Sequence, residues 1–372
     1  MLKETLRCLL KDADVIDKRQ RKKVKHKVNE IIGIALFATL SNAKSWEDIE
    51  DFGLVHNKFL REYFVLEYGI PSHDTIQRVF AMFSPEYFEE YRTKFNELLN
   101  SNEGDKIRKI LAIDGKTQCG NACENQKANH IVSCVDNNGF CLGDVLVNDK
   151  SNEITAIPKL IDKLNVKGHI ITTDAMGTQI EIVKKIRSKK ADYVLALKAN
   201  QGTLYEEVKQ YFDDSDLLKK CKYKRTIEKA RSGVETREYW QIDHVSWITN
   251  FKKWTGLKSI IMTRNTIKKN DKITTENRYF ISSLKLDVKE AARAIRSHWM
   301  VESYHWHLDV TFKEDNDTTL EKQAAYNLNI LRKLALNILK LFDVGRPHVS
   351  LRRKKFIISL NPIKYLQEIL EI

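Results

Sequence analysis

The chain has 372 residues, of which 42% are hydrophobic and 30% are charged, and its formal net charge is +13. This length suffices to bury a full core in two or more domains, and the composition excludes a fibrous or low-complexity protein. The charge excess favours a polyanionic partner, of which DNA and RNA are the most common.

The N-terminal part of the sequence does not have the pattern of an exported or membrane-spanning protein. Its longest apolar run, Ile31–Leu40, is too short to span a bilayer. Residues 1–20 lack a basic segment followed by an apolar one with a small-residue cleavage site. The six cysteines are scattered, which is typical of free thiols in a reducing compartment. We therefore expect a cytoplasmic protein with no membrane partner.

Residues 1–100 have the apolar spacing of helices. The expected helices cover 28–40, 46–60, 72–83 and 85–99. Ser72 suits the N-cap of the third helix. Helix 73–83 could read DNA in the major groove, or its apolar face could serve packing alone. The basic run Lys18–Lys27 could likewise follow a DNA backbone or form a solvated linker.

An α/β region follows residue 100. Strands are expected at Lys109–Ile113, Ile131–Val135, Phe140–Val147, His169–Thr173 and Tyr193–Leu197. The segment Asp136–Gly139 is a hairpin turn between the second and third strands. Helices are expected at Ile154–Leu164 and after a capping box formed by Thr178 and Glu181. This order predicts an α/β fold with a mixed sheet and helices on its faces.

Residues 200–278 interrupt the alternation and predict a β-rich insertion. They hold one expected helix, Leu204–Phe212, and basic loops. The strand-like segments lie at Glu235–Val245, Lys258–Arg264 and Tyr279–Ser283. Two long helices follow, at about Val288–Asp309 and Leu320–Leu341, before a tail that is basic and then apolar.

Three acidic residues lie where a metal site could form. Asp114 and Asp174 each follow the apolar run of a predicted strand. If both strands run the same way, their carboxylates meet at the carboxyl edge of the sheet. Glu302 lies inside a long helix. The helical spacing places four side chains near Glu302 on one face: His298, His305, Trp306 and Asp309.

Carboxylates in this arrangement suit phosphodiester transfer. Two Mg²⁺ ions about 4 Å apart can activate a water or a 3′-hydroxyl and stabilise the leaving oxygen. Hard cations of this kind take oxygen ligands and keep open positions for phosphates. An Asp after a strand is also a common turn former, and a Glu in a long helix is often only solvated. The spacing alone leaves both interpretations open.

Several longer motifs resemble one known family. They are LAIDGKT (111–117), DKSNEITAIPKL (149–160), TTDAMGTQ (172–179) and HWMVESYHWHLDVTFKED (298–315), with IPSHDTIQRVF (70–80) before them. In this order they resemble the DDE-type bacterial insertion-sequence transposases, in the subgroup that includes the H-repeat-associated proteins. The resemblance extends over nearly the whole chain.

The resemblance implies a two-part organisation. A small all-helical N-terminal domain, 1–105, would bind the DNA ends of the element. An RNase H-like catalytic domain, 106–372, would carry the β-rich insertion at about 200–278. The implied partner is double-stranded DNA, both the inverted repeats of the element and the target. A dimer is expected on DNA. The implied location is the bacterial cytoplasm, at the nucleoid.

The resemblance also implies a reaction. Asp114, Asp174 and Glu302 would be the catalytic and metal-binding residues, and the expected cofactor is Mg²⁺ or Mn²⁺, as two ions. The enzyme would cut at the ends of an insertion sequence and join the freed 3′-hydroxyl ends to target DNA. The alternative is a catalytically inactive or repurposed DNA-binding relative.

The chain departs from the family near Glu302. Many relatives carry a Tyr-Arg-Glu-Lys signature, at whose offsets this chain has Ile295, His298 and Asp309. The contacts with DNA are therefore expected from Lys116, Arg296, His298, His305 and Lys313. Lys116 could contact a phosphate or only neutralise nearby acidic groups.

Two further features have competing interpretations. Trp299 and Trp306 could stack on an unpaired base or, as the more common arrangement, pack in the core beside the catalytic helix. The spacing C-x3-C-x6-H-x3-C of Cys119, Cys123, His130 and Cys134 fits the common zinc patterns poorly.

Overall fold

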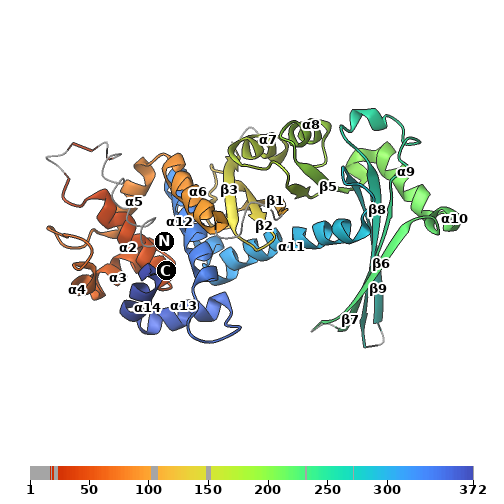
Figure 1. The fold of residues 1–372 in the computed structure, drawn as a ribbon. Coiled ribbons are helices and arrows are strands. Elements are labelled where there is room, and N and C mark those ends of the chain that lie inside the picture. Colours follow the sequence, from red (N-terminus) through yellow and green to blue (C-terminus); the bar gives the residue numbers. More distant parts are fainter. Residues whose placement is uncertain are drawn as a thin grey trace.

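The molecule is elongated and has three parts (Figure 1). The computed structural model describes residues 24–101, 108–147, 152–230, 233–270 and 272–371, together with Asp17, Arg19 and Gln20. Helices from both ends of the chain form one end of the molecule, a sheet with flanking helices forms the middle, and a long β blade forms the other end. The 24-residue helix α11 (Val288–Thr311) runs along the sheet from the blade to the helical end.

The central sheet has the RNase H-like order and confirms the predicted α/β fold. Its strands are β1 (Ile110–Thr117), β2 (His130–Asp136), β3 (Cys141–Val147), β4 (Ile170–Thr173) and β5 (Asp192–Leu197). β1, β2 and β3 form an antiparallel meander, whereas β4 and β5 run parallel to β1. The β2–β3 turn uses Gly139 at φ 80°, a conformation that glycine adopts without steric cost.

Opposite faces of the sheet pack against different helices because side chains alternate along a strand. Leu111 and Ile113 of β1 belong to the core beneath α7 (Glu153–Lys163) and α8 (Ile180–Ser188). Ala112 belongs to the core shared with α11 and α12 (Lys322–Leu341). The same alternation directs Asp114 to the side of α11.

The N-terminal helices share one hydrophobic core with the C-terminal helices. They are α2 (Val28–Leu40), α3 (Trp46–Val55), α4 (Asn57–Leu60), α5 (His73–Met82) and α6 (Pro85–Ser101), and they pack around α12 with α13 (Leu351–Leu360) and α14 (Pro362–Glu371). Trp46 Nε1 donates a hydrogen bond to Thr319 Oγ1 at 2.7 Å, and Asn327 Nδ2 donates to the Phe80 carbonyl at 2.7 Å. The predicted boundary at residue 105 and part of the basic run Lys18–Lys27, namely residues 18 and 21–23, lie outside the described residues. None of the described helices combines the length and the apolar character needed to cross a bilayer.

The predicted insertion is rich in β structure and extends the central sheet. After α9 (Gly202–Asp213) and α10 (Ser215–Leu218), its strands are β6 (Lys222–Ala230), β7 (Gly233–Ile242), β8 (Ser259–Lys269) and β9 (Lys272–Ser282). We call these four strands the blade. β9 pairs antiparallel with β5, which gives one nine-stranded sheet of order β3-β2-β1-β4-β5-β9-β8-β7-β6.

Two local predictions were wrong. Residues 222–230 were expected to be a basic loop but form β6, an edge strand that hydrogen bonds to β7 and leaves Tyr223 and Ile227 exposed. Its pattern lacks the buried face by which a strand is recognised. Thr178 does not cap α8, which begins after Gln179 without a side-chain cap. The Thr178 hydroxyl instead donates to the Ala196 carbonyl of β5 at 2.5 Å.

A buried cluster of charges joins the helical end to the sheet. Asp144 of β3, with no exposed side-chain surface, accepts hydrogen bonds from Arg92 of α6 and Lys333 of α12, each at 2.8 Å. Lys333 also donates to Ser133 Oγ at 2.9 Å, and Tyr326 OH donates to Asp144 at 3.0 Å. Burial raises the pKa of the Asp144 carboxyl, but the two adjacent cations outweigh this and hold it well below its usual range.

Replacing Asp144 tests the importance of this cluster. Asp144→Asn leaves Arg92 and Lys333 buried without their anion, and we expect a loss of about 3–5 kcal/mol in the free energy of unfolding. The measurement is denaturant unfolding at neutral pH, with the exposed-pair variant Glu181→Gln as the control. Because the folded-state pKa of Asp144 is depressed, its contribution to stability is present above the unfolded pKa and is lost as the pH falls. A wild-type stability for Asp144→Asn would contradict this role.

Candidate active site

Asp114 and Asp174 lie side by side at the carboxyl edge of the sheet. In the parallel pair β1–β4, Ile113 is the partner of Thr173. Asp114 directly follows Ile113, and Asp174 directly follows Thr173. Asp114 is still inside β1, which continues to Thr117, whereas Asp174 begins the loop after β4. The alternation of side chains directs both toward α11.

The loop after β4 holds one oxygen of Asp174. The backbone amides of Met176 and Gly177 donate to Asp174 Oδ1 at 2.9 Å and 3.2 Å. A Cβ on Gly177 would come within 2.6 Å of Thr173 Oγ1, so a glycine permits this tight turn. The Asp174 carboxylate is therefore oriented before any ligand binds.

Helix α11 brings Glu302 and two histidines to the same edge. His298 Nδ1 lies 3.0 Å from Thr172 Oγ1 on β4, and His305 Nδ1 lies 3.6 Å from Asp114 Oδ2. Glu302 lies four residues after His298 and three before His305, a spacing that puts all three on one face of the helix. Glu302 and Asp174 line the same cavity.

Asp114 acts electrostatically on both of the other carboxylates. Burial and then the charge of Asp114 raise the pKa of Glu302. Burial, followed by the charges of Asp114 and Glu153, likewise raises the pKa of Asp174, although the Gly177 amide opposes it. Burial lowers the pKa of His298, which favours its neutral form. In the described part of the chain, no three His, Cys, Asp or Glu side chains converge closely enough to hold one metal ion.

A cavity of about 760 Å³ lies between α11 and the blade. Asp174, Glu302 and His298 line one side of it, and Arg278 of β9 lines another. Trp299 lines this cavity, and its side chain is 43% exposed. Trp306 is 53% exposed. Of the two interpretations considered for these tryptophans, packing in the core is therefore wrong, and stacking on a base stays a prediction. The sequence does not show which face of α11 the sheet covers.

Two residues near the aspartates were missed by the sequence reasoning. They are Glu153, the first residue of α7, and His130 of β2. Glu153 Oε1 lies within hydrogen-bonding distance of His130 Nε2, at 2.7 Å, and His130 Nδ1 lies 2.8 Å from Thr117 Oγ1. Gly115 lets this pair approach β1, since a Cβ there would come within 2.1 Å of Glu153 Oε1. The only signal for Glu153 was its place in the motif 149–160.

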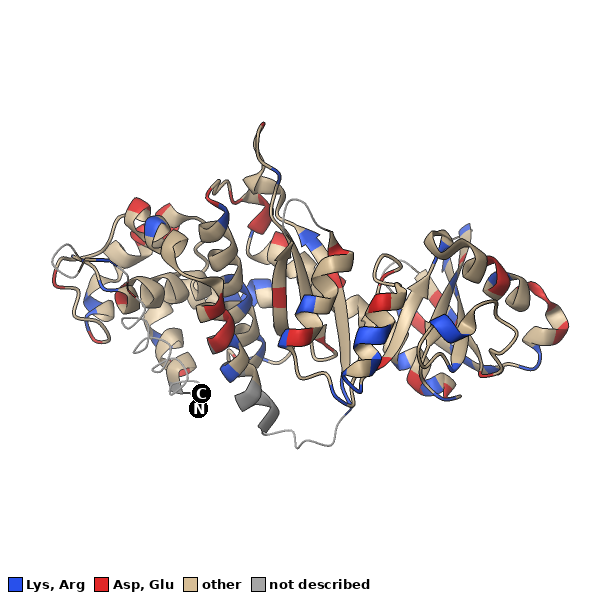
Figure 2. Cartoon of the chain, turned by 90° about the horizontal axis from the view of Figure 1, so that it is seen from above, with Lys and Arg blue, Asp and Glu red and all other residues tan. Residues whose placement is uncertain are grey.

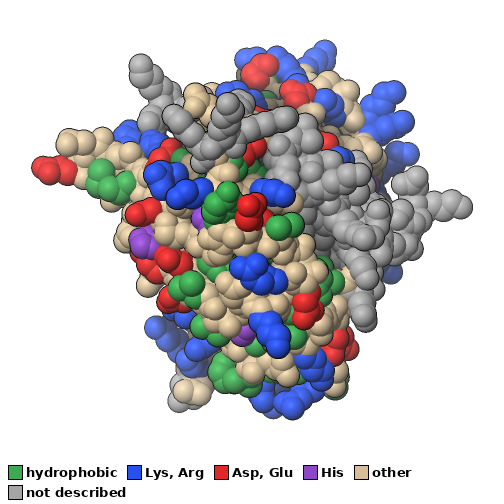
Figure 3. All heavy atoms as spheres, turned by 90° about the vertical axis from the view of Figure 1, so that its left-hand side faces the viewer, with side chains coloured by type: hydrophobic (Ala, Val, Ile, Leu, Met, Phe, Trp, Pro, Cys, Tyr) green, Lys and Arg blue, Asp and Glu red, His purple; other side chains and the backbone are tan. Residues whose placement is uncertain are grey.

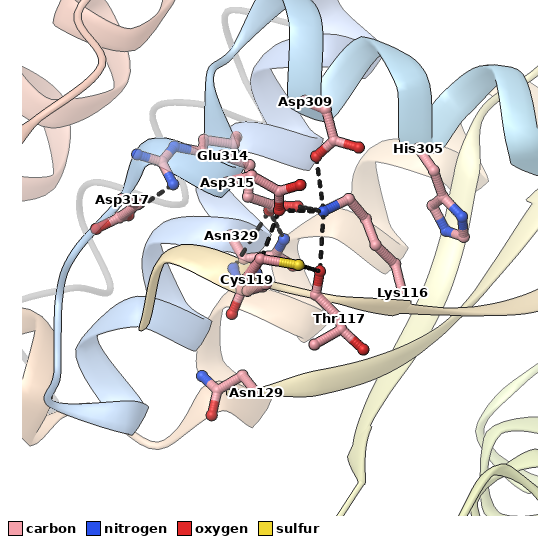
Figure 4. Close-up of polar contacts among 12 residues, drawn as sticks. Lys116, Thr117, Cys119, Asn129, His305, Asp309, Glu314, Asp315, Asp317 and Asn329 are labelled. Atoms are coloured by element: carbon pink, nitrogen blue, oxygen red, sulfur yellow. Dashed lines mark hydrogen bonds and ion pairs between the residues drawn. The ribbon is translucent and has the colours of Figure 1, made fainter. Parts of the chain in front are cut away.

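Lys116 points into a cluster of acidic groups (Figure 4). Its Nζ lies 2.7 Å from Asp309 Oδ1, 3.0 Å from Glu314 Oε2 and 2.9 Å from Asp315 Oδ1. These carboxylates raise the pKa of Lys116 above its usual range, although burial opposes the shift. The contacts favour the interpretation that Lys116 neutralises acidic groups and ties β1 to the end of α11, and a contact with phosphate stays a prediction.

The other expected DNA-binding residues lie at different distances from the carboxylates. Arg296 is exposed and lines the cavity, and Lys313 is exposed beyond the end of α11 at φ 57°. Lys and Arg are distributed over all three parts of the molecule (Figure 2). On the face of the helical end seen in Figure 3, they are mixed with acidic and hydrophobic side chains. In helix α5, His73 is bound to Glu50 at 2.6 Å.

The suggested zinc ligands do not form a site. Cys119 and Cys123 are exposed, whereas Cys134 is buried in β2, and all three are free thiols. His130 is bound to Glu153 and Thr117. No metal-holding group that includes these residues occurs within the described ranges.

Comparisons with known proteins identify the family. Residues 105–338 match the family described as transposase DDE domain, and residues 13–95 match the associated N-terminal family. YbfL of Escherichia coli strain K12 is 38% identical over 366 residues, which cover 94% of each chain. YhhI of the same strain, which carries an H repeat-associated transposase name, is 37% identical over 365 residues, again 94% of each chain. The RNase H-like sheet with its edge carboxylates agrees with these matches, and the chain belongs to the DDE transposase family.

One relative has lost activity. YbfQ of Escherichia coli strain K12, named an inactive transposase, is 52% identical over 63 residues, which are 17% of this chain and 75% of that protein. Membership of the family therefore does not by itself establish catalysis.

Divalent cations provide a test of the carboxylate site that does not depend on catalysis. We expect Mg²⁺ or Mn²⁺ to stabilise the fold by about 2.7 kcal/mol at 100 times the dissociation constant, and Asp174→Asn to abolish the effect. The stabilisation should decrease as the pH falls, because protons and the cation compete for the same carboxylates. Since the pKa values of Asp174 and Glu302 are raised, this loss should begin at a higher pH than it would for ordinary carboxyl groups. Thermal unfolding with and without the cation measures it. Equal stabilisation of wild type and Asp174→Asn would refute the assignment.

The two roles considered for Lys116 make different predictions. If Lys116 neutralises the cluster, Lys116→Met leaves the buried Glu314 carboxylate unpaired and costs about 3 kcal/mol of stability. Adding Glu314→Gln should restore most of that loss, because the uncompensated charge is removed. Denaturant unfolding of the two single variants and the double variant measures the coupling. Purely additive losses would rule out the neutralising role.

Proposed function

We propose that this chain is a transposase that cuts DNA at the ends of an insertion sequence and joins the 3′-hydroxyl ends to target DNA. One observation carries the proposal. Two aspartates follow paired residues of adjacent parallel strands, and a glutamate on the facing helix shares their electrostatic field. Carboxyl groups whose pKa values are raised by burial and by a neighbouring carboxylate are typical of functional sites.

The donor set fits hard divalent cations. Asp114, Asp174 and Glu302 would hold Mg²⁺ or Mn²⁺, as two ions, through carboxylate oxygens. The raised pKa values of Asp174 and Glu302 reflect burial and repulsion from Asp114, and a bound cation would relieve the repulsion. When bound, such ions lower the pKa of a water or hydroxyl and stabilise charge on a phosphate.

The side chains around the carboxylates would position the DNA strand. The amides of Met176 and Gly177 fix one oxygen of Asp174, which leaves the other free for a ligand. His298, whose lowered pKa favours the neutral form, holds α11 against β4 through Thr172. The cavity beside Glu302 has room for an unpaired nucleotide, and the exposed ring of Trp299 offers a surface on which a base can stack.

The division of labour along the chain follows the same proposal. Residues 1–105 would bind the inverted repeats, and residues 106–372 would carry out catalysis with the insertion at about 200–278. Cutting two ends together would require a dimer on DNA. The net charge of +13 supports binding to the phosphate backbone.

A second candidate is a DNA-binding relative without catalysis. It is favoured by the similarity to the inactive YbfQ and by the presence of His298 and Asp309 at positions where many relatives carry basic residues. The two candidates differ in one result. Incubation with element-end DNA and Mg²⁺ or Mn²⁺ yields defined 3′-hydroxyl ends only if the chain is an active enzyme.

Neutral isosteres test the catalytic residues. Asp114→Asn, Asp174→Asn and Glu302→Gln should each reduce Mg²⁺-dependent cleavage by a factor on the order of 10³ or more, because each removes one anionic ligand. Binding of end DNA should be retained, since a negative charge is lost in each variant. Single-turnover cleavage and equilibrium binding are measured on the same preparations.

The control for these variants is Glu206→Gln, an exposed carboxylate on α9. It should cut at the wild-type rate. Any of the three variants that also cuts at the wild-type rate removes that residue from the site. Binding by the wild type without any product would support the second candidate.

A further inference from the structure

The cavity beside Glu302 has a basic and aromatic wall. The guanidinium carbons of Arg278 on β9 and Arg296 on α11 lie 5.7 Å and 5.8 Å from the centre of the Trp299 ring. All three residues line the cavity that also contains Asp174 and Glu302. Two cations from different parts of the chain thus meet at one exposed ring next to a candidate catalytic carboxylate.

Arg278 differs from the other blade arginines that line the cavity. Arg237 is largely buried and bound to both Glu228 and Glu235, and Arg264 lies 5.2 Å over the Trp240 ring with its Nε donating to Asn277. Both are committed to contacts within the blade. Because these contacts occupy their guanidinium groups, we do not expect Arg237 or Arg264 to bind a ligand.

Arg278 is held by a weaker partner. Its Nε and Nη2 donate to Glu276 at 2.9 Å and 3.0 Å, and both side chains of this ion pair are about half exposed. Water and salt screen such a pair, so a phosphate can replace the Glu276 carboxylate at little cost. A guanidinium suits this exchange because its planar donors bind two oxygens of one phosphate.

The position of Arg278 in the sheet explains how the blade reaches the site. Tyr279, the next residue, is the first of β9 to pair with β5, at Leu197. Arg278 therefore lies where the blade joins the catalytic sheet. Its charge lowers the pKa of Glu302 against the effect of burial and lowers the pKa of His298 in the same direction as burial, so its field extends to the carboxylate site.

The positive charge that helix α11 itself brings to this cavity comes from Arg296. His298 is bound to Thr172 with a lowered pKa, and Asp309 is paired with Lys116. Lys198 also lines the cavity, and Arg278 and Arg296 are the two lining cations that lie against the Trp299 ring.

Resting on the function proposed above, we propose that Arg278 is a catalytic residue supplied by the blade, which binds a DNA phosphate adjacent to the bond that is cut. The ligand class is a phosphodiester of a strand that enters the cavity. The insertion is then part of the active site, and Trp299 and Arg296 form the adjoining wall.

The test compares Arg278→Gln, Arg278→Lys and the control Arg225→Gln, an exposed arginine on the edge strand β6. The substrate is end DNA in which phosphates flanking the cut are replaced one at a time by neutral methylphosphonates. Single-turnover cleavage, DNA binding and thermal unfolding are measured for each combination. Arg278→Gln should slow cleavage on the order of 10²-fold with an unchanged unfolding temperature, and Arg278→Lys should recover part of the rate.

The modified phosphates identify the contact. If Arg278 binds one of them, neutralising that phosphate slows the wild type and Arg225→Gln but adds no further loss to Arg278→Gln. Additive losses at every phosphate, or cleavage by Arg278→Gln at the wild-type rate, would overturn the inference and leave the proposed function intact. A wild type that binds end DNA and never cuts it would overturn the proposed function, and this inference with it.

Discussion

The parallel pairing of β1 with β4 is the constraint on which the rest of the site depends. It places the residues after Ile113 and Thr173 at one edge of the sheet, and alternation then turns Asp114 and Asp174 to the same face. Two like charges held this close repel each other, and the raised pKa of Asp174 reflects that repulsion together with burial. The ladder and the cores on both faces maintain the arrangement, because a slip of one residue would turn the aspartate of that strand toward the core on the opposite face.

Helix α11 connects the three parts of the molecule across this edge. It contacts β1, β2 and β4 of the central sheet and β6 and β7 of the blade, and its last turn contacts α13. Behind it, α12 is buried along most of its length, and Lys333 anchors it to Asp144 of β3. The position of Glu302 is thus set by the packing of the whole molecule, since the helix that carries it cannot shift without disturbing both ends.

Two cations near the carboxylates, Lys116 and Arg278, differ in how accessible they are to a ligand. Lys116 lies two residues from Asp114, yet its ammonium group is enclosed by three acidic side chains. Arg278 lies far away in the sequence, yet its guanidinium borders the cavity and has one exposed partner. Proximity in the sequence made Lys116 one candidate ligand for phosphate, whereas solvent access and pairing favour Arg278.

The sequence by itself determined the order of the central elements, the hairpin at Gly139 and the positions of Asp114 and Asp174 after their apolar runs, because period, turn residues and local capping are encoded over a few neighbouring residues. It did not predict β6, whose strand character comes from pairing with β7, or the exposure of Trp299 and Trp306, which depends on the face of α11 that the sheet covers. The sequence also did not predict that Glu153 and Arg278 lie near the site. Only the tertiary structure decided these features, since each depends on contacts between segments far apart in the chain.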